Sequence, residues 1–337
     1  MSATIKDIAT YTGVSATTVS NVIHGRSGRV SAETIAKIED AIDKLGYVPN
    51  MSARALVSSS SKVIALINHA VTYQNRNFME DPFQSALVGI IESVLREHGY
   101  FLMLRTVESG ADLKAFLRNW NVDGLFITGV FRDSFFKTLS HLSLPIVLID
   151  SYIHHSNFCN VGLEDFKGSN DATKYMIAHG HKKIAFVSPS IKDGGVLQER
   201  FLGYKSALME AGIPYDKTLV IEYRIDLESL IQLSYELARI DGLTAIVTTA
   251  DIIAAGLITG FYRQGIRVPE DISIIGFDDL IISQVLTPPL TTIHQDMPLK
   301  AQKAVEFMIQ KLEGKTLSET EVILPTSLVE RESVRSL

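Results

Sequence analysis

Residues 4–23, TIKDIATYTGVSATTVSNVI, decide the N-terminal fold. Thr4 precedes an apolar residue and Asp7 follows three positions later, which is a capping-box pattern for the start of a helix. Gly13 supplies a turn, and Ser15 is a natural N-cap for a second helix. The stretch therefore predicts two short helices joined by a tight turn.

The second predicted helix has two different faces. At about 100° per residue, Val19, Val22 and Ile23 fall on one side. The opposite arc is small and polar, and holds Ala16, Thr17, Ser20, Asn21 and His24. Such an arc suits a helix in the DNA major groove, where short side chains let the backbone approach the bases. Periodicity alone also fits an ordinary amphipathic hairpin with a solvated face.

A third helix is predicted from Ser31, its N-cap, to Gly46, which is placed to end it. Its apolar residues are Ile35, Ile38, Ile42 and Leu45. Three helices around one small apolar cluster complete this unit. Residues 47–56 follow and are too few to hold a helix alone in water, so we expect them to fold only with a partner.

The charge of the chain gives little support for DNA binding. The net charge is −6, and the first sixty residues carry six basic against five acidic side chains. Non-specific binding to nucleic acid depends on many lysines and arginines that neutralise phosphates. A DNA-binding prediction must therefore rest on the residue pattern, and we expect modest non-specific affinity that falls with salt.

Five motifs occur in register along the first 56 residues. They are Thr4-Ile-Lys-Asp-Ile-Ala, Gly13-Val-Ser15, Thr18-Val-Ser20, Gly46-Tyr47-x-Pro49-Asn50 and Ala53-Arg-x-Leu56. Together they resemble the headpiece and hinge of the LacI/GalR family of transcriptional regulators. The resemblance implies a helix-turn-helix headpiece over residues 1–48 and a hinge helix or linker over residues 49–61.

The resemblance also implies roles for individual residues. Ala16, Thr17 and Asn21 would read bases from the second helix. The DNA backbone contacts would be Lys6, Ser15, Arg26, Arg29, Asn50 and Arg54. Leu56 would enter the minor groove when two hinge helices pair on palindromic operator DNA. A disordered linker with an incidental leucine is the alternative for the hinge.

The connection from His24 to Ser31 departs from the family pattern, because it is one residue longer and contains two glycines and two arginines. Arg26 and Arg29 can add phosphate contacts there, and a plain flexible loop is equally compatible with the sequence.

From Val63 onward, short β-rich runs alternate with helical patterns, which is typical of βαβ units and a parallel sheet. The predicted strands lie at residues 63–67, 101–104, 124–128, 146–149, 184–187, 220–223, 245–248 and 273–276. The pattern restarts midway, so two similar α/β lobes are expected. Two facing lobes place a ligand site in the cleft between them, at the carboxyl ends of the strands.

Enzymatic signatures are missing from this part of the sequence. No GxGxxG, Walker, Gly-x-Ser-x-Gly or paired-histidine motif falls at a strand-to-helix junction, and no cofactor or metal site is expected. The single cysteine, Cys159, has no metal-ligand spacing around it and is interpreted as structural. The lobes therefore look like a binding module.

The body carries four further markers, Gly180-His181-Lys182-Lys183-Ile184, Arg200-Phe-Leu-Gly203-Tyr204, Ile275-Gly276-Phe277-Asp278-Asp279 and Pro288-Pro289-Leu290-Thr291-Thr292-Ile293. They resemble the LacI/GalR sensor, which is itself similar to periplasmic sugar-binding proteins. The resemblance implies an effector-binding and dimerisation domain over residues 62–337. We expect lobe one at about 62–161 and 292–321 and lobe two at about 162–291 and 322–337, with three crossings.

In the family, the positions of Arg200, Asp278 and Asp150 face the effector. An arginine with two carboxylates can make charge-assisted hydrogen bonds to sugar hydroxyls. Structural carboxylates that cap strand ends or pair with the arginine are the alternative for the two aspartates. Asp251 is expected to be a helix N-cap with a secondary claim on the pocket.

Several pocket positions depart from familiar members, so the identity of the effector is not inherited. Phe83 follows a long insertion and is the best candidate to pack on a sugar ring, with a core role as the alternative. Ile225 replaces an aromatic residue found in some relatives, and Val196 stands where a hydroxyl residue is common.

The sequence thus predicts a cytoplasmic, non-enzymatic transcriptional repressor with a small all-α headpiece and a two-lobed α/β sensor. A sugar-like effector would release DNA by allostery, and the chain would form a homodimer because it ends without a heptad tail. No membrane segment or export signal is recognised. A phosphocarrier protein as co-effector is the alternative, and a stand-alone sugar-binding or chemosensing protein is a weaker one.

Overall fold

The computed structural model describes residues 3–23, 25, 27–48, 60–69 and 78–337. The chain divides into two compact units, Met1–Ser61 and Lys62–Leu337. None of the helices in the described part of the chain has the length and apolar character that a bilayer crossing requires.

Three helices lie in the described part of the first unit, α1 (Ile5–Thr12), α2 (Ala16–Ile23) and α3 (Ala32–Leu45). Thr4 and Asp7 form the predicted capping box, and Gly13 ends α1 in the left-handed region with φ 72°. The Ser31 side chain caps α3, which ends at Gly46. The fully buried core of this unit is Ile8, Val19, Ile38 and Ala41. The predicted three-helix unit is confirmed.

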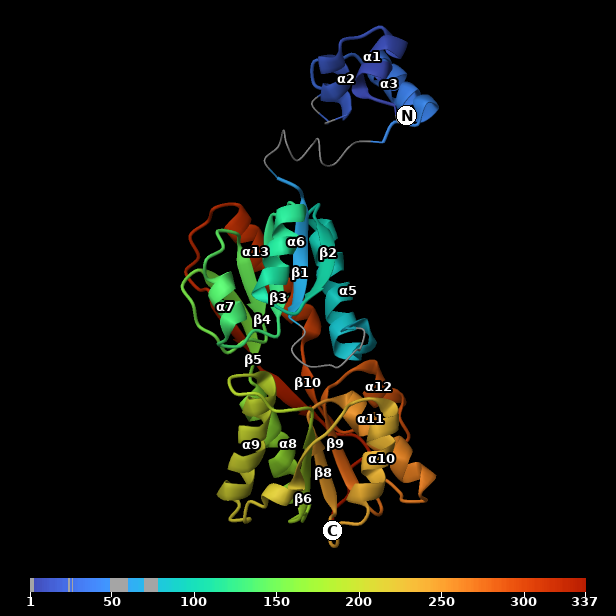
Figure 1. The fold of residues 1–337 in the computed structure, drawn as a ribbon. Coiled ribbons are helices and arrows are strands. Elements are labelled where there is room, and N and C mark those ends of the chain that lie inside the picture. Colours follow the sequence, from blue (N-terminus) through green and yellow to red (C-terminus); the bar gives the residue numbers. More distant parts are fainter. Residues whose placement is uncertain (1–2, 24, 26, 49–59, 70–77) are drawn as a thin grey trace. The chain divides into compact units, whose positions relative to one another are not determined.

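The second unit begins with a lobe built on a sheet that has, among the described residues, six strands in the order β11-β5-β4-β3-β1-β2. They are β1 (Val63–His69), β2 (Phe101–Val107), β3 (Gly124–Thr128), β4 (Ile146–Ile149), β5 (Phe158–Leu163) and β11 (Glu321–Leu324). Neighbouring strands run parallel. Its helices are η1 (Phe78–Glu80), α5 (Pro82–Glu97), α6 (Gly110–Asn119), α7 (Ser134–Leu139) and α13 (Met297–Leu312). Helices α5 and α13 pack on one face of the sheet, and α6 and α7 pack on the other (Figure 1).

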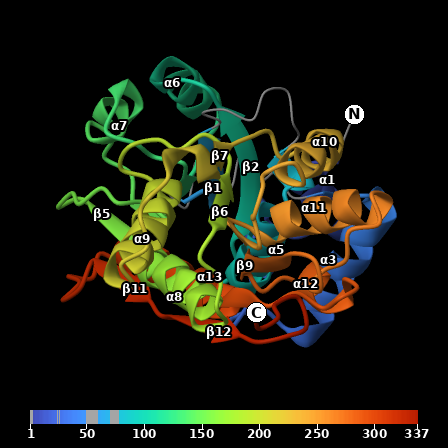
Figure 2. The same cartoon turned by 90° about the horizontal axis from the view of Figure 1, so that it is seen from below.

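The second lobe lies wholly within the described residues and holds another six-stranded sheet, in the order β12-β10-β9-β8-β6-β7. Its strands are β6 (Ile184–Ser188), β7 (Val220–Glu222), β8 (Ala245–Thr248), β9 (Ser273–Asp278), β10 (Thr292–Gln295) and β12 (Thr326–Val329). Strand β12 runs antiparallel to β10. The helices are α8 (Asp165–Ala178), α9 (Val196–Glu210), η2 (Lys217–Leu219), α10 (Leu227–Leu237), α11 (Asp251–Arg263) and α12 (Ile281–Val285). Figure 2 shows α8 and α9 on one side of this sheet and α10 and α11 on the other.

Burial on both faces explains why the strands read as unbroken apolar runs. Every residue of β3, β4 and β8 is buried. Cys159 is fully buried in β5, within the core beneath α13. The predicted two-lobed α/β architecture with parallel sheets is therefore confirmed.

The chain crosses between the lobes slightly later than we expected. Strand β5 continues to Leu163, β10 pairs with β9 in lobe two, and β11 pairs with β5 in lobe one. The crossings thus follow residues 163, 295 and 324, where we expected them near Gly162, Thr291 and Val322. The difference arises because each strand completes its pairing before the chain leaves the sheet.

Candidate functional site

Helix α2 presents an exposed face of small side chains. Its residue Val19 is fully buried against the other two helices, while Ala16 and Thr17 are exposed and Asn21 is half-buried. The α1–α2 turn is three residues long and passes through Gly13, whose positive φ favours glycine. The predicted base-reading residues therefore share one accessible surface.

The predicted phosphate-contacting residues in the described part of the headpiece are Lys6, Ser15 and Arg29, and all three are exposed. The Ser15 hydroxyl oxygen accepts a hydrogen bond from the backbone N–H of Thr18 at 3.1 Å, so this side chain also caps α2. The other predicted DNA contacts, Arg26, Asn50, Arg54 and Leu56, lie outside the described residues.

A cavity of about 1050 Å³ lies in the second unit, with walls from both lobes. Six of the seven predicted effector-binding residues line it, namely Phe83, Asp150, Val196, Arg200, Ile225 and Asp278. Asp150 directly follows β4, and Asp278 is the last residue of β9. The cavity therefore lies at the carboxyl ends of strands, where open α/β sheets bind ligands.

Both of these aspartates have a positive φ, 53° at Asp150 and 115° at Asp278. A non-glycine residue in such a conformation costs about 1–3 kcal/mol, which the surrounding structure must offset. Strain of this kind concentrates at functional sites, and here it occurs where two carboxylates reach the cavity wall.

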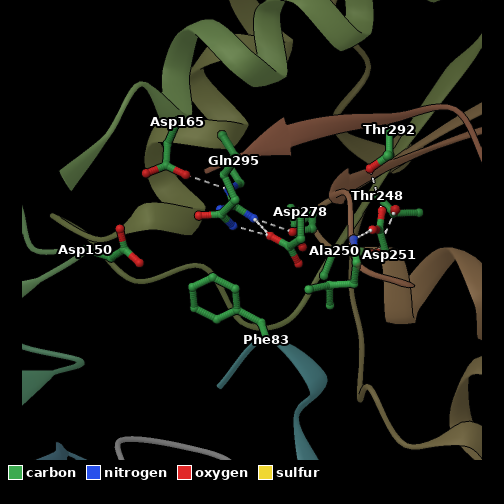
Figure 3. Close-up of polar contacts among 12 residues, drawn as sticks. Phe83, Asp150, Asp165, Thr248, Ala250, Asp251, Asp278, Thr292 and Gln295 are labelled. Atoms are coloured by element: carbon green, nitrogen blue, oxygen red, sulfur yellow. Dashed lines mark hydrogen bonds and ion pairs between the residues drawn. The ribbon is translucent and has the colours of Figure 1, made fainter. Parts of the chain in front are cut away.

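Arg200 lies in the cavity wall, and Figure 3 shows the two carboxylates that engage it, Asp165 and Asp278. The guanidinium is buried, stacks on the Phe277 ring at 3.5 Å, and donates from Nε to Asp165 Oδ1 at 2.8 Å. Its Nη1 donates to the carbonyl oxygen of Thr249 at 2.5 Å and lies 3.8 Å from Asp278 Oδ1. A rigid cation is thus held between two carboxylates.

Burial raises the pKa of Asp278 well above its ordinary value, and the Arg200 guanidinium opposes that rise. Burial also raises the pKa of Asp165, again opposed by Arg200. Tyr152 donates its hydroxyl to Asp165 Oδ2 at 2.7 Å. The Arg200 guanidinium therefore favours the charged form of both carboxyl groups, against the effect of burial.

The cavity wall also offers polar atoms that the described residues leave without a hydrogen-bond partner. They include Oγ1 of Thr249 and Oε1 of Gln84, both buried. Phe83, Val196 and Ile225 add an apolar surface. Buried polar groups are normally paired, so unpaired ones in a cavity wall favour a ligand that carries hydroxyl groups.

Comparisons with known proteins agree with this arrangement. A family model described as bacterial regulatory proteins of the lacI family matches residues 4–50, and a periplasmic binding protein-like domain model matches residues 173–334. The ribose operon repressor of Haemophilus influenzae is 33% identical over 344 residues, which cover 99% of each chain. The chain belongs to the LacI family.

Two solved LacI-family structures resemble the whole chain. The lac repressor dimer bound to operator and the anti-inducer ONPF is 25% identical, with a TM-score of 0.82 and complete coverage of both chains. A complex of the transcriptional regulator CelR with cellobiose is 28% identical, with a TM-score of 0.72, and the match covers 98% of this chain and 99% of that one. The predicted function class, a DNA-binding transcriptional regulator and not an enzyme, is confirmed by this membership.

Asp251 has a different position in this LacI-family chain from the one we expected. The N-cap of α11 is Ala250, and Asp251 is the first helical residue, fully buried and absent from the cavity wall. It accepts hydrogen bonds from Thr292 Oγ1 at 2.5 Å and from the backbone N–H of Leu280 at 2.9 Å. Burial raises the pKa of Asp251 to about 7. Its carboxyl group thus ties α11 to the connection between β9 and α12 and to β10.

Three residues of the polar site were missed by sequence reasoning, namely Asp165, Thr249 and Lys300. Asp165 follows β5, a strand that the sequence patterns did not reveal, so its place at a strand end was hidden. Lys300 lies one turn before Ala304 on the buried face of α13, and that spacing was a usable signal. Thr249 directly follows β8, a predicted strand, so its place at a strand end was also a usable signal.

Proposed function

We propose that this chain is a homodimeric repressor that binds a palindromic operator and is released from it when an uncharged sugar-like molecule occupies the interlobe cavity. The observation that carries the proposal is the set of groups in the cavity wall. Asp150 and Asp278 offer acceptors, Thr249 offers an unpaired hydroxyl, and Phe83 offers a flat apolar surface. A polyol presents alternating donors and acceptors on an apolar ring, so it complements all three features.

The relatives support this class of effector. CelR has been solved with cellobiose, and a curated relative is named for the ribose operon. We do not expect a strong anion, because the buried Arg200 is already engaged by Asp165 and Asp278. Among the described residues, the other cations of the wall are Arg224, which pairs with Asp226, and Lys192, which lies over the Phe131 ring. The sign of the response, release on binding, is the usual one for sugar inducers and is part of the proposal.

On the DNA side, we assign base reading to Ala16, Thr17 and Asn21, and phosphate contacts to Lys6, Ser15 and Arg29. The roles of Arg26, Asn50, Arg54 and Leu56 rest on the family resemblance. Leu56→Ala should weaken specific operator binding and leave the thermal stability of the second unit unchanged. Undiminished specific binding would contradict the wedge role of Leu56.

A dimer is supported by apolar side chains that the single chain leaves exposed. Phe101, on β2 at the edge of the first sheet, is 61% exposed, and Ile281 and Val285 on α12 are 73% and 70% exposed. Ile281 and Val285 lie one turn apart on α12, and neighbouring exposed apolar side chains favour an interaction surface. The lac repressor structure cited above is a dimer. The phosphocarrier co-effector stays an open alternative, testable by pull-down with a purified phosphocarrier.

The decisive experiment has two stages. First, a thermal-shift screen covers neutral sugars, phosphosugars, nucleosides and amino acids, and we expect the melting temperature to rise with a neutral sugar. Second, the hit is added to the protein on operator DNA selected from a random pool, where anisotropy should fall. Stabilisation by a phosphosugar alone would contradict the effector class, and failure to select any DNA sequence would contradict the repressor proposal.

A further inference from the structure

Lys300 is a fully buried lysine at the fourth position of α13, in the first lobe. Its ammonium donates to Asp150 Oδ1 at 2.6 Å and to Gln295 Oε1 at 2.7 Å, and it lies 5.4 Å from the centre of the Phe83 ring. An ammonium removed from water is tolerated only where such partners replace its hydration. The site is therefore built around this charge.

The two partners of Lys300 belong to different lobes. Asp150 directly follows β4 in lobe one, while Gln295 is the last residue of β10 in lobe two. The amide of Gln295 continues the connection, because its Nε2 donates to Asp278 Oδ1 at 2.7 Å. With its carbonyl toward an ammonium and its NH₂ toward a carboxylate, this amide can bond both only in one orientation.

A continuous chain of hydrogen bonds thus runs from Asp150 through Lys300 and Gln295 to Asp278. Its two ends are the carboxylates that face the effector cavity, one in each lobe. In Figure 3, Gln295 lies beside Asp278, and Asp150 lies apart from both, across the site. A ligand that forms a hydrogen bond with either carboxylate therefore contacts one end of this series of hydrogen bonds.

We propose that Lys300 is a positioning residue of the effector site, which holds the two cavity-facing carboxylates at a fixed spacing by joining the lobes. This inference rests on the proposed function for its biological meaning, although its test needs neither effector nor DNA. Lys300 itself does not line the cavity, so it acts through Asp150 and Asp278.

The test measures the distance between the lobes in the full chain. The single native cysteine, Cys159, is fully buried, so spin labels can be placed at Lys114→Cys on α6 and Met209→Cys on α9. Lys114 is exposed on lobe one, and Met209 is 74% exposed on lobe two. Electron double resonance then gives the distance distribution, with excess unlabelled chain added to suppress distances between subunits.

Three variants distinguish an effect of Lys300 on the distance between the lobes from an effect on folding stability. Lys300→Met removes the ammonium but leaves Asp150 without its partner, so it should also lower stability. Asp150→Asn with Lys300→Met removes both charges and should recover stability while the link to Gln295 stays absent. Lys303→Met removes a lysine of the same helix whose ion pair with Glu306 is at the surface, and serves as the matched control.

We expect one narrow distance distribution in the parent and in Lys303→Met, and a broadened or shifted one in both Lys300 variants. A parental distribution in the double variant would overturn the inference, because Lys300 would then only neutralise Asp150. If Lys300→Met does not fold, the double variant still decides. A failed effector screen would leave this result untouched, so the two proposals fail separately.

Discussion

The exposed face of α2 and the wall of the interlobe cavity are assembled in opposite ways. The α2 face comes from one helix of eight residues, whose side chains repeat at a fixed angle. The cavity wall comes from both lobes, with side chains as far apart in sequence as Asn68 and Asp278. A recognition surface on one helix can change residue by residue, whereas the cavity depends on charges that hold one another in place.

Among the substitutions that test this comparison, we expect the largest loss of stability when Arg200, in the cavity wall, is replaced. Arg200→Ala leaves Asp165 and Asp278 buried without their cation and should lower the free energy of unfolding by about 3–5 kcal/mol. Urea unfolding followed by circular dichroism measures the change. The control is Arg224→Ala, whose side chain is 72% exposed and should matter by less than about 1 kcal/mol. Equal losses in the two variants would mean that the network does not carry the stability we assign to it.

The second prediction concerns Asp251, a buried carboxyl group outside the cavity wall, and tests whether its role is structural. Its pKa is raised from 3.8 to about 7, so the folded state holds a proton that the unfolded state loses. Its stabilising contribution is therefore complete below about pH 4 and is lost as pH rises toward 7. The loss is on the order of 4 kcal/mol, because the pKa rises by about three units and each unit is worth about 1.4 kcal/mol.

Asp251→Asn should remove that pH dependence, because the amide can accept from Leu280 N–H and donate to Thr292 Oγ1. The measurement is the difference in unfolding free energy between parent and variant from pH 4 to pH 7. Parallel curves would show that Asp251 is not the titrating group. Ligand-induced stabilisation should survive this substitution, since Asp251 is absent from the cavity wall.

The third prediction tests the exposed face of α2 by substitution of Asn21. Asn21→Ala should relax base preference at one position of each half-site by about 1–3 kcal/mol and leave the cavity unit unaffected. Competition among operator variants measures the preference. Lys6→Ala is the control, because loss of a phosphate contact should weaken all sequences alike and reduce the salt dependence. Uniform weakening in Asn21→Ala would make that residue a backbone contact.

The same contrast explains how much the sequence could predict. The three headpiece helices were predictable with their caps, because Thr4, Gly13, Ser31 and Gly46 act on neighbours a few residues away. Eight of the described strands were predictable from apolar runs, and six residues of the cavity wall from family motifs.

Pairing between distant residues was not predictable in the same way. The bond of Lys300 to Asp150 joins positions 150 residues apart, and the bond of Arg200 to Asp165 depends on how α8 packs against α9. Asp251 was misassigned for this reason, since a carboxylate after a strand fits an N-cap as well as a buried tie to β10. Local patterns identify the elements, and tertiary packing decides which charges meet.

The smallest effect is expected at Thr4, whose hydroxyl accepts from the backbone N–H of Asp7 at 3.3 Å. Thr4→Ala should destabilise α1 by about 1 kcal/mol, because one helical N–H loses its cap while Asp7 still bonds the Thr4 backbone. Amide hydrogen exchange in the full chain reads this locally, and the cavity unit should keep its protection. Thr10→Ala, which removes an exposed hydroxyl bonded within α1, should be neutral or slightly stabilising. If Thr4→Ala instead lowers protection across both units, the headpiece and the sensor do not unfold independently, and the comparison between a local and an assembled surface loses its energetic basis.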